Sequence, residues 1–358
     1  FLDNKLTPLL VVAALALGVL AVVATPREEE PQIVVPMIDV LAPWPGASAT
    51  DVERLVAVPL ERAIREIPAV EYAYSTSEPS GAMIVARFFV NSDPDRALID
   101  VKDKVGGAFR RLPAGALEPQ VTPRSIDDVP VLAVTFSSDR YDPLALRRIA
   151  SEGEEEIRSI PHVASTTLVG GLKREIRVEP DAARLASHGL GPAAVAMALA
   201  KASASLPAGS FGSRAGETVV ESGDFLGSAD DVGSVVVSAP MGNPVRIRDV
   251  AAVIDGPEEP RSYVFHAEPG RPTVPAVTLA VAKTRGANAT LGSEEVLKRI
   301  ETLRGRLLPG DVRTTVTRDY GETAKEKSNE LIFHLLLATL SVVALMALAL
   351  GWREAVVV

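Results

Sequence analysis

Uncharged apolar residues gather in two long stretches, one near each end of the chain. No Asp, Glu, Lys or Arg occurs from Leu6 to Ala24 or from Leu331 to Gly351. Each stretch is about 20 residues long, the length at which an α-helix crosses roughly 30 Å of hydrocarbon. The pattern therefore predicts two transmembrane helices, at residues 6–24 and 331–351. The alternatives are a cleaved signal peptide for the first stretch and a buried core helix for the second.

The segment after the first stretch alternates between the apolar spacing of strands and that of helices. Ser48 and Asp51 form an approximate capping box at the start of its first helix, and Pro59 should kink that helix or shift its start. The predicted order is strand, helix, strand, strand, helix, strand, at 33–41, 52–67, 70–76, 83–90, 94–112 and 118–122. This βαββαβ order predicts a sheet with both helices on one face.

The same order begins again near Val131. Six residues recur in the same arrangement: Glu61, Ile64, Arg65, Ile67, Pro68 and Val70 match Glu154, Ile157, Arg158, Ile160, Pro161 and Val163. After a strand at 173–178, a segment rich in Gly, Ser and Pro interrupts this copy, which resumes with a strand, a helix and a strand at 277–282, 290–307 and 312–316. We interpret this as an internal duplication, and a chance likeness between two amphipathic helices is the alternative.

These patterns predict an α+β fold with two transmembrane helices and two βαββαβ subdomains of the ferredoxin-like type. A small α+β insert interrupts the second subdomain. The predicted boundaries are 6–24 for the first membrane helix, 25–124 for the first subdomain, 125–180 and 263–320 for the two parts of the second, 181–262 for the insert, 331–351 for the second membrane helix and 355–358 for the start of a third helix.

The chain is acidic, with a net charge of -9, and contains no cysteine. The acidic balance argues against a nucleic-acid partner, and the lack of cysteine excludes a disulfide framework or a thiolate metal site within this chain. Lys5 and Arg353, beside the two apolar stretches, place both termini on the cytoplasmic side and the large loop outside. The chain begins with Phe1 and ends in a new apolar run, so we interpret it as a fragment of a longer polytopic protein.

Residue patterns that would indicate an enzyme are missing from the sequence. The four histidines lack metal-ligand spacing, and there is no phosphate-binding loop, dinucleotide fingerprint or nucleophile elbow. Asp127 and Asp128 are interpreted as the start of a loop, and Glu28 to Glu30 as a solvated linker or, alternatively, a cation-binding run. Neither apolar stretch holds Asp or Glu, so no catalytic, metal or proton-relay residue is predicted in this fragment.

Several motifs, spread in order along the whole chain, are similar to those of one membrane-protein family. They are PREEEPQIVVPMIDVLAPWPGASATDVERLVAVPLE at 26–61, SIDDVPVL at 125–132, GGLKREIRVEP at 170–180, IRDVA at 247–251, TRGANA at 284–289 and GWREA at 351–355. With these motifs the chain resembles the inner-membrane permeases of the resistance-nodulation-division (RND) superfamily. The branch that it resembles is the hydrophobe and amphiphile exporters of the multidrug, acriflavin-resistance type.

The resemblance implies a function and a set of partners. The fragment would be the N-terminal part of a proton-driven efflux pump, a secondary active transporter and not an enzyme. It would contain two porter subdomains, with the insert as a docking subdomain, and need no cofactor beyond the proton-motive force. The resemblance also implies a multi-pass protein of the bacterial inner membrane with its large loop in the periplasm. The partners would be two further copies in a homotrimer, a periplasmic adaptor, an outer-membrane channel, membrane lipids and lipophilic small molecules.

In the family, strands of the second porter subdomain help to form the drug pocket. By position, the candidates are Val131, Ala133, Thr135, Thr167, Val169, Val264 and Phe265. Only Phe265 is aromatic, and aromatic residues make up 4% of the chain, which favours smaller or less aromatic substrates. We expect the two subdomains to rock against each other, coupled to the membrane through linkers at 25–32 and 320–330. The alternatives are an RND pump for metal ions or lipids, and a two-pass sensor receptor with an extracytoplasmic binding domain.

Overall fold

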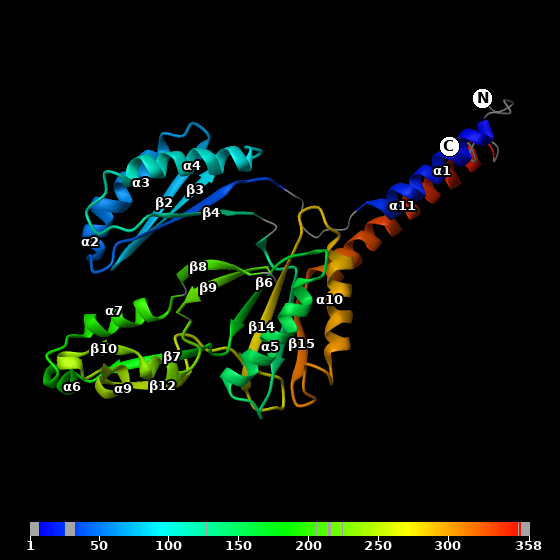
Figure 1. Cartoon of the computed structure of the whole chain (residues 1–358). Helices are drawn as coiled ribbons and strands as arrows, with labels where there is room; N and C mark the ends of the chain where they lie inside the picture. The colour runs from blue at the N-terminus through cyan, green and yellow to red at the C-terminus, as the bar shows by residue number, and fades with distance from the viewer. Residues whose placement is uncertain are drawn as a thin grey trace.

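In the computed structural model, the described residues are 7–25, 33–125, 128–204, 206–213, 216–223, 225–349 and 351. They contain three separate clusters of buried apolar side chains, and two apolar helices extend away from the sheets (Figure 1). The acidic run at Glu28 to Glu30, Asp127 and the predicted third helix at 355–358 lie outside the described residues.

The first unit has the predicted order of strands and helices. Its elements are β1 (Met37–Pro43), α2 (Ala49–Val52), a π-helical turn (Glu53–Ala57), α3 (Val58–Arg65), β2 (Val70–Glu78), β3 (Gly81–Phe88), α4 (Pro94–Phe109) and β4 (Gln120–Arg124). The strands form an antiparallel sheet in the order β2-β3-β1-β4. Ser48 caps the first helix as predicted, because its hydroxyl accepts the N–H of Asp51 at 3.2 Å.

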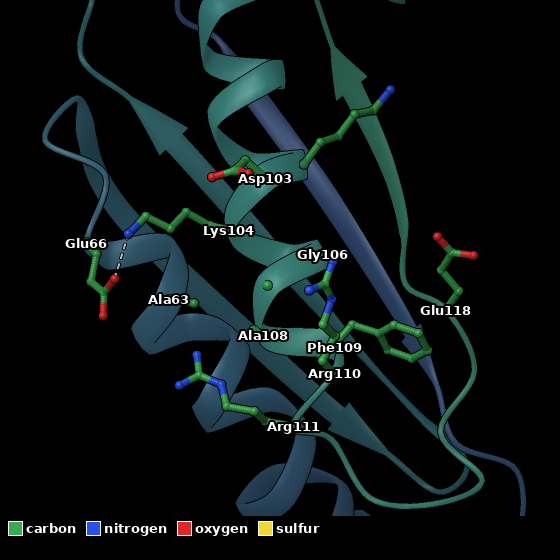
Figure 2. A pocket seen from close by; sticks show the side chains of 12 residues that line it. Ala63, Glu66, Asp103, Lys104, Gly106, Ala108, Phe109, Arg110, Arg111 and Glu118 are labelled. Carbon is green, nitrogen blue, oxygen red and sulfur yellow. Dashed lines mark hydrogen bonds and ion pairs between the residues drawn. The ribbon is translucent and has the colours of Figure 1, made fainter.

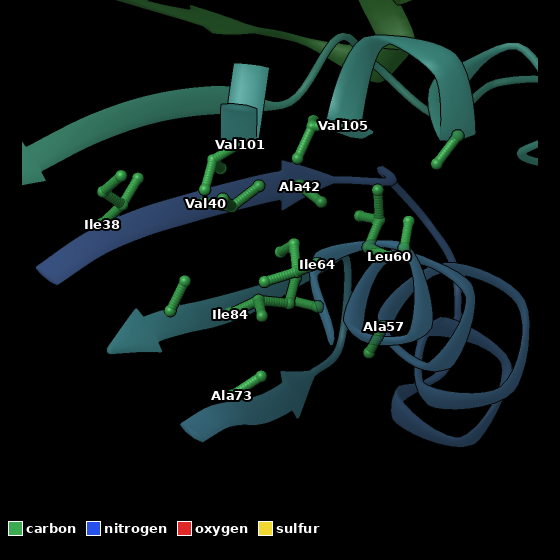
Figure 3. Close-up of a cluster of buried hydrophobic side chains, with 14 of the residues drawn as sticks. Ile38, Val40, Ala42, Ala57, Leu60, Ile64, Ala73, Ile84, Val101 and Val105 are labelled. Carbon is green, nitrogen blue, oxygen red and sulfur yellow. The ribbon is translucent and has the colours of Figure 1, made fainter. Parts of the chain in front are cut away.

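The core of the first unit follows from the alternation of side chains along β1. Val40 and Ala42 are buried, whereas Leu41 between them is 46% exposed, because successive strand residues point to opposite faces of a sheet. The buried side chains pack against apolar residues of α3 and α4, such as Leu60 and Val101 (Figure 3). One face of the sheet therefore lies in the core, and the other face carries no helix of this unit.

Pro59 is the second residue of α3, and the chain enters α3 from α2 through a wider, π-helical turn. Proline has no N–H, and its ring clashes with the carbonyl group four residues earlier in a regular α-helix. In the π-helical turn Glu53–Ala57, the N–H of Val58 bonds to the carbonyl five residues back. The extra residue in this turn accommodates Pro59, and α3 begins beside the proline, in line with the predicted kink or shifted start.

The second unit repeats the strand order of the first. Its elements are β5 (Leu132–Ser137), α5 (Pro143–Arg158), β6 (Val163–Gly170), β13 (Phe265–His266), β14 (Val274–Lys283), α10 (Ala289–Leu303) and β15 (Arg313–Asp319). The antiparallel order β6-β14-β5-β15 corresponds strand by strand to β2-β3-β1-β4, and β13 pairs with the first residues of β14. Alternate residues of β5, including Val134 and Phe136, are buried with apolar residues of α5 and α10. The shared order agrees with an internal duplication.

The insert lies between β6 and β13 and has its own small apolar core. Its elements are β7 (Arg174–Pro180), α6 (Ala182–Ser187), α7 (Pro192–Ala202), β8 (Leu206–Ser213), β9 (Gly216–Ser222), α8 (Ala229–Ser234), β10 (Val236–Ser238), a 3-10 turn (Pro240–Gly242), β11 (Val245–Arg246), α9 (Ile247–Val250) and β12 (Ala251–Pro257). β7 lies in the segment predicted for the second subdomain, yet it pairs with β12 and not with the second sheet. Gly170 and Gly171, with φ angles of +90° and +65°, turn the chain out of that sheet.

Among the helices of the described residues, only α11 (Tyr320–Ala349) is long and apolar enough to cross a membrane. α1 (Thr7–Ala24) contains a shorter apolar stretch, Leu9–Val22, so the first predicted span stays a prediction. Large apolar side chains of both helices are exposed, for example Leu15 at 66% and Leu345 at 67%. The predicted linker at 320–330 forms the first turns of α11, which begins directly after β15.

Candidate functional site

Four of the predicted pocket residues share one face of the second sheet. Thr135 on β5 lies opposite Thr278 of β14, and Val169 on β6 lies opposite the same threonine. One pair further along, Ala133 and Thr167 both lie opposite Ala280 of β14. The apolar residues of β5 that belong to the cluster with α5 and α10 are the even-numbered ones, so these four candidates lie on the opposite face. We call it the open face of the second sheet.

Hydroxyl groups are the main polar feature of this open face. Thr135 is only 4% exposed, and its Oγ1 lies 2.8 Å from Oγ1 of Thr278 and 3.2 Å from Oγ1 of Thr317. The hydroxyl of Thr317 also donates to the carbonyl of Ala133 at 3.2 Å. Ser137, two residues beyond Thr135, is fully buried, and its hydroxyl has no hydrogen-bond partner among the described residues. The face thus offers a row of hydroxyls across β14, β5 and β15.

The other three candidates lie at the margins of the open face or away from it. Val131 stands just before β5, where its N–H bonds to the carbonyl of Val281 and its own carbonyl accepts the N–H of Tyr320. Val264 accepts the N–H of Ala276 through its carbonyl. Phe265 pairs with Pro275, so it points to the opposite face from its neighbour Val264. The structure therefore separates the one aromatic candidate from the rest.

Phe265 instead belongs to an exposed aromatic pair at the sheet edge. Its ring is 59% exposed and stacks on that of Tyr263, with 6.2 Å between the ring centroids. Beside it, the carboxylate of Glu268 lies 3.1 Å from Nε2 of His266 and 3.1 Å from a guanidinium nitrogen of Arg271. The hydrogen bond with His266, followed by the nearby positive charges, lowers the pKa of Glu268.

Sequence reasoning missed residues on both sheets. Thr278 and Thr317 enter the open face because strand pairing brings them beside Thr135, and the alternating threonines of β15 were the available signal. On the helix-free face of the first sheet, the rings of Tyr72 and Tyr74 stack at 5.9 Å and are about half exposed. Aromatic side chains are therefore presented by the first unit, where no candidate was predicted.

Comparison with known proteins assigns the chain to a family. A family model described as AcrB/AcrD/AcrF matches residues 2–358. The chain belongs to this family. The multidrug resistance protein MdtC of Yersinia pseudotuberculosis serotype O:1b (strain IP 31758) and that of Yersinia pestis bv. Antiqua (strain Angola) are each 28% identical over 339 residues, or 94% of this chain and 32% of the relative. The predicted resemblance to RND multidrug permeases is confirmed, and the chain spans about a third of the length of these relatives.

In this AcrB/AcrD/AcrF-family chain, the first turn of α11 packs closely on α10. The hydroxyl of Thr290 donates to the carbonyl of Gly321 at 2.9 Å, and a Cβ added to Gly321 would lie 2.6 Å from Oγ of Ser293. Lys325 and Glu294 form an ion pair of 2.7 Å one turn further along. Small residues thus let the two backbones approach closely, and α11 is fastened to the second unit by β15 and by α10.

A cavity of about 780 Å³ lies beside α3 and α4 of the first unit (Figure 2). Its charged lining residues include Glu66 and Lys104, whose side chains form an ion pair of 2.7 Å. The hydrogen bond from Lys104 lowers the pKa of Glu66. In the part of the chain that the structure describes, no group of three or more His, Asp or Glu side chains is arranged to hold a metal ion.

Proposed function

We propose that the chain is the N-terminal part of a proton-driven pump that exports lipophilic or amphiphilic compounds from the inner membrane or periplasm of a bacterium. The observation that carries this proposal is the match of the AcrB/AcrD/AcrF family model to residues 2–358. Two α/β units with the same strand order, attached to strongly apolar helices, support it. Paired units of this kind suit a transporter, because packed bodies move by hinge and shear with little internal change.

In the proposed architecture, residues 6–24 and 331–351 cross the membrane and both α/β units lie in the periplasm. The units are ferredoxin-like porter subdomains, at 25–124 for the first and at 125–180 with 263–320 for the second. Residues 181–262 are the docking subdomain. The exposure of apolar side chains along α1 and α11 supports both spans, because such surfaces are stable in hydrocarbon and not in water.

The proposed transport step depends on the joint between α11 and the second unit. Helix α11 continues from β15 and packs on α10, so a movement of the membrane helix is transmitted to the second sheet. The first unit follows α1 along the chain, and the described residues just before β1, 33–36, belong to no helix. We infer that the units tilt relative to each other and that the open face of the second sheet, with Thr135 at its centre, forms one wall of the substrate cleft.

In this proposal, the proton-binding residues that drive transport and the partner proteins lie outside this chain. The described parts of α1 and the segment Leu331–Ala349 carry no Asp or Glu, so the proposal assigns the proton-binding carboxylates to other membrane helices of the full protein. We propose a homotrimer that works with a periplasmic adaptor and an outer-membrane channel. No cofactor and no enzymatic step are part of the proposal.

The test uses the full-length protein in a bacterial strain that lacks its own multidrug pumps. Accumulation of lipophilic dyes should fall when the protein is made, and a protonophore should abolish this effect. Thr135→Val, which removes a hydroxyl at nearly constant volume, should change the order of preference among dyes and detergents. Thr302→Val, on the exposed side of α10, is the matched control and should leave it unchanged. Dye accumulation that is the same with and without the protein would refute the proposed function.

A further inference from the structure

One end of the open face carries charged side chains. His266 of β13 lies opposite Val274 of β14. Ser137 of β5 lies opposite Ala276 of β14 on one side and opposite Arg313 of β15 on the other. Val274 and Ala276 lie an even number of residues before the threonine of β14 in the hydroxyl row, so they point to the same side of the sheet. His266, Ser137 and Arg313 therefore all lie on the open face.

The carboxylate of Glu268, in the turn after β13, lies among these charges. Its Oε1 is 3.1 Å from Nε2 of His266, and its Oε2 is 3.1 Å from a guanidinium nitrogen of Arg271. The hydrogen bond with His266 lowers the pKa of Glu268 most, and the positive charges of Arg271 and Arg313 lower it further. Among the described residues, Arg271 has no other acidic partner, and Arg313 has no ion pair within 4.0 Å. The cluster thus contains two guanidinium groups and an imidazole around a single carboxylate.

A buried hydroxyl without a partner lies between β13 and β15, in the same part of the open face. Ser137 is 0% exposed, and no described residue forms a hydrogen bond with its hydroxyl. Val274 and Ala276, on the neighbouring strand, are buried as well. A hydroxyl left unpaired in such surroundings destabilises the folded chain. This cost is recovered when a ligand supplies the missing acceptor.

Glu268 is held by contacts that the carboxylate of a ligand could take over. It belongs to a tight turn, in which the N–H of Arg271 bonds to the carbonyl of Glu268 at 3.1 Å and Gly270 has a φ angle of +77°. The strand before this turn, β13, is only two residues long, and the side chain of Glu268 is 33% exposed. Ion pairs that water can reach contribute little to stability, because both charges are also well solvated when apart. The side chain of Glu268 can therefore rotate away from His266 at a small cost.

We propose that Glu268 occupies an anion subsite of the open face, and that substrates with a carboxylate beside an apolar tail displace it. This inference rests on the proposed function, in which the open face is one wall of the substrate cleft. The substrate carboxylate binds His266 and Arg313 and accepts the hydroxyl of Ser137, while Glu268 stays paired with Arg271 in their turn. The apolar tail lies along Val169, which is 48% exposed on the same face. Glu268 is thus a specificity-determining residue, because a neutral head group cannot replace its charge.

The experiment measures the binding of dansylaminohexanoic acid and of its methyl ester to the purified full-length protein, by fluorescence anisotropy. Glu268→Gln should tighten binding of the acid about tenfold and leave the ester unchanged, because it removes a competing charge of the same sign. Arg313→Gln should weaken binding of the acid about tenfold, again without an effect on the ester. Ser137→Ala, added to Glu268→Gln, should remove part of the gain, because the bound carboxylate loses a hydroxyl donor.

Glu301→Gln is the matched control, because Glu301 also pairs with an arginine three residues later, at 3.2 Å, but lies on α10. It should bind the acid as the unmodified protein does. Arg313→Lys, which keeps the charge, should retain most of the binding and covers the case in which Arg313→Gln impairs folding. No gain for the acid in Glu268→Gln, an equal gain for acid and ester, or the same gain in Glu301→Gln would overturn the inference. Dye export in cells tests the proposed function separately, since binding to the purified protein does not depend on it.

Discussion

Gly321 is the position at which a single added methyl group should loosen the joint between α10 and α11. A Cβ there would lie 2.6 Å from Oγ of Ser293 and 2.7 Å from the carbonyl oxygen of Ala289, closer than the 3.0 Å that such contacts respect. The serine side chain can rotate, but the carbonyl belongs to the backbone of α10. Gly321→Ala therefore requires the two helices to separate at their crossing.

The expected cost can be worked out from three terms. Overpacking of this kind costs about 1–3 kcal/mol. Separation of the helices also weakens the buried hydrogen bond from Thr290 to the carbonyl of Gly321, for about 0.5–1.5 kcal/mol. The gain in helix propensity from Gly to Ala is at most ~1 kcal/mol and is smaller at the second residue of α11. We expect Gly321→Ala to destabilise the second unit by roughly 1–3 kcal/mol.

Hydrogen exchange of the chain in detergent micelles measures this loss locally. Peptides from α10 and β15 should exchange roughly 5- to 150-fold faster in Gly321→Ala, because exchange follows the free energy of opening. Gly107→Ala, inside α4 with nothing within 4 Å of the new Cβ, is the matched control and should slow exchange in the first unit through the same gain in propensity. Equal slowing by both substitutions would show that the steric reasoning is wrong.

Two further predictions concern the turn at Gly170 and Gly171 and the effect of pH. Gly170→Ala should destabilise the second unit by about 2 kcal/mol or more, because φ is +90° and the new Cβ would lie 2.6 Å from Cβ of Val264. Hydrogen exchange measures this loss. Gly189→Ala is the control, because it adds a Cβ at a positive φ angle with no atom within 4 Å. The pKa of Asp255 is lowered by Arg174, so its contribution to stability is complete above about pH 4 and is lost as the pH falls through the lowered folded-state pKa. Thermal unfolding of Asp255→Asn should depend less steeply on pH in this acidic range, and an unchanged slope would count against the pair.

Local features of the sequence were sufficient to predict the order of strands and helices in the first unit. The helix cap at Ser48 depends only on its hydroxyl and the N–H of Asp51 three residues later, so it can be predicted from neighbouring residues. Alternation along β5 likewise predicted which side chains share a face, because that period is a property of the extended chain. The predicted candidates Ala133, Thr135, Thr167 and Val169 lie on one face for this reason. Their role in binding stays a prediction.

Contacts between residues far apart in the chain could not be predicted from the sequence. The hydroxyl of Thr135 meets Thr278 and Thr317, which lie 143 and 182 residues further along the chain. Nothing in the local pattern distinguishes a threonine that reaches this row from one that faces solvent. For the same reason, the pairing of β7 with β12 could not be predicted from the sequence. It depends on the turn at Gly170 and Gly171 and on the packing of the insert.

The apolar stretches, the order of strands and helices in the first unit, the repeat and the family could be predicted from the amino-acid sequence, because each depends on neighbouring residues or on shared motifs. The pairing of strands, the side chains that meet on the open face and the packing of α11 on α10 depend on the tertiary structure. Arg148 of α5 and Lys173, which lie 25 residues apart in the sequence, both line one cavity. Those features depend on long-range pairing and close packing, which exist only once the chain has folded.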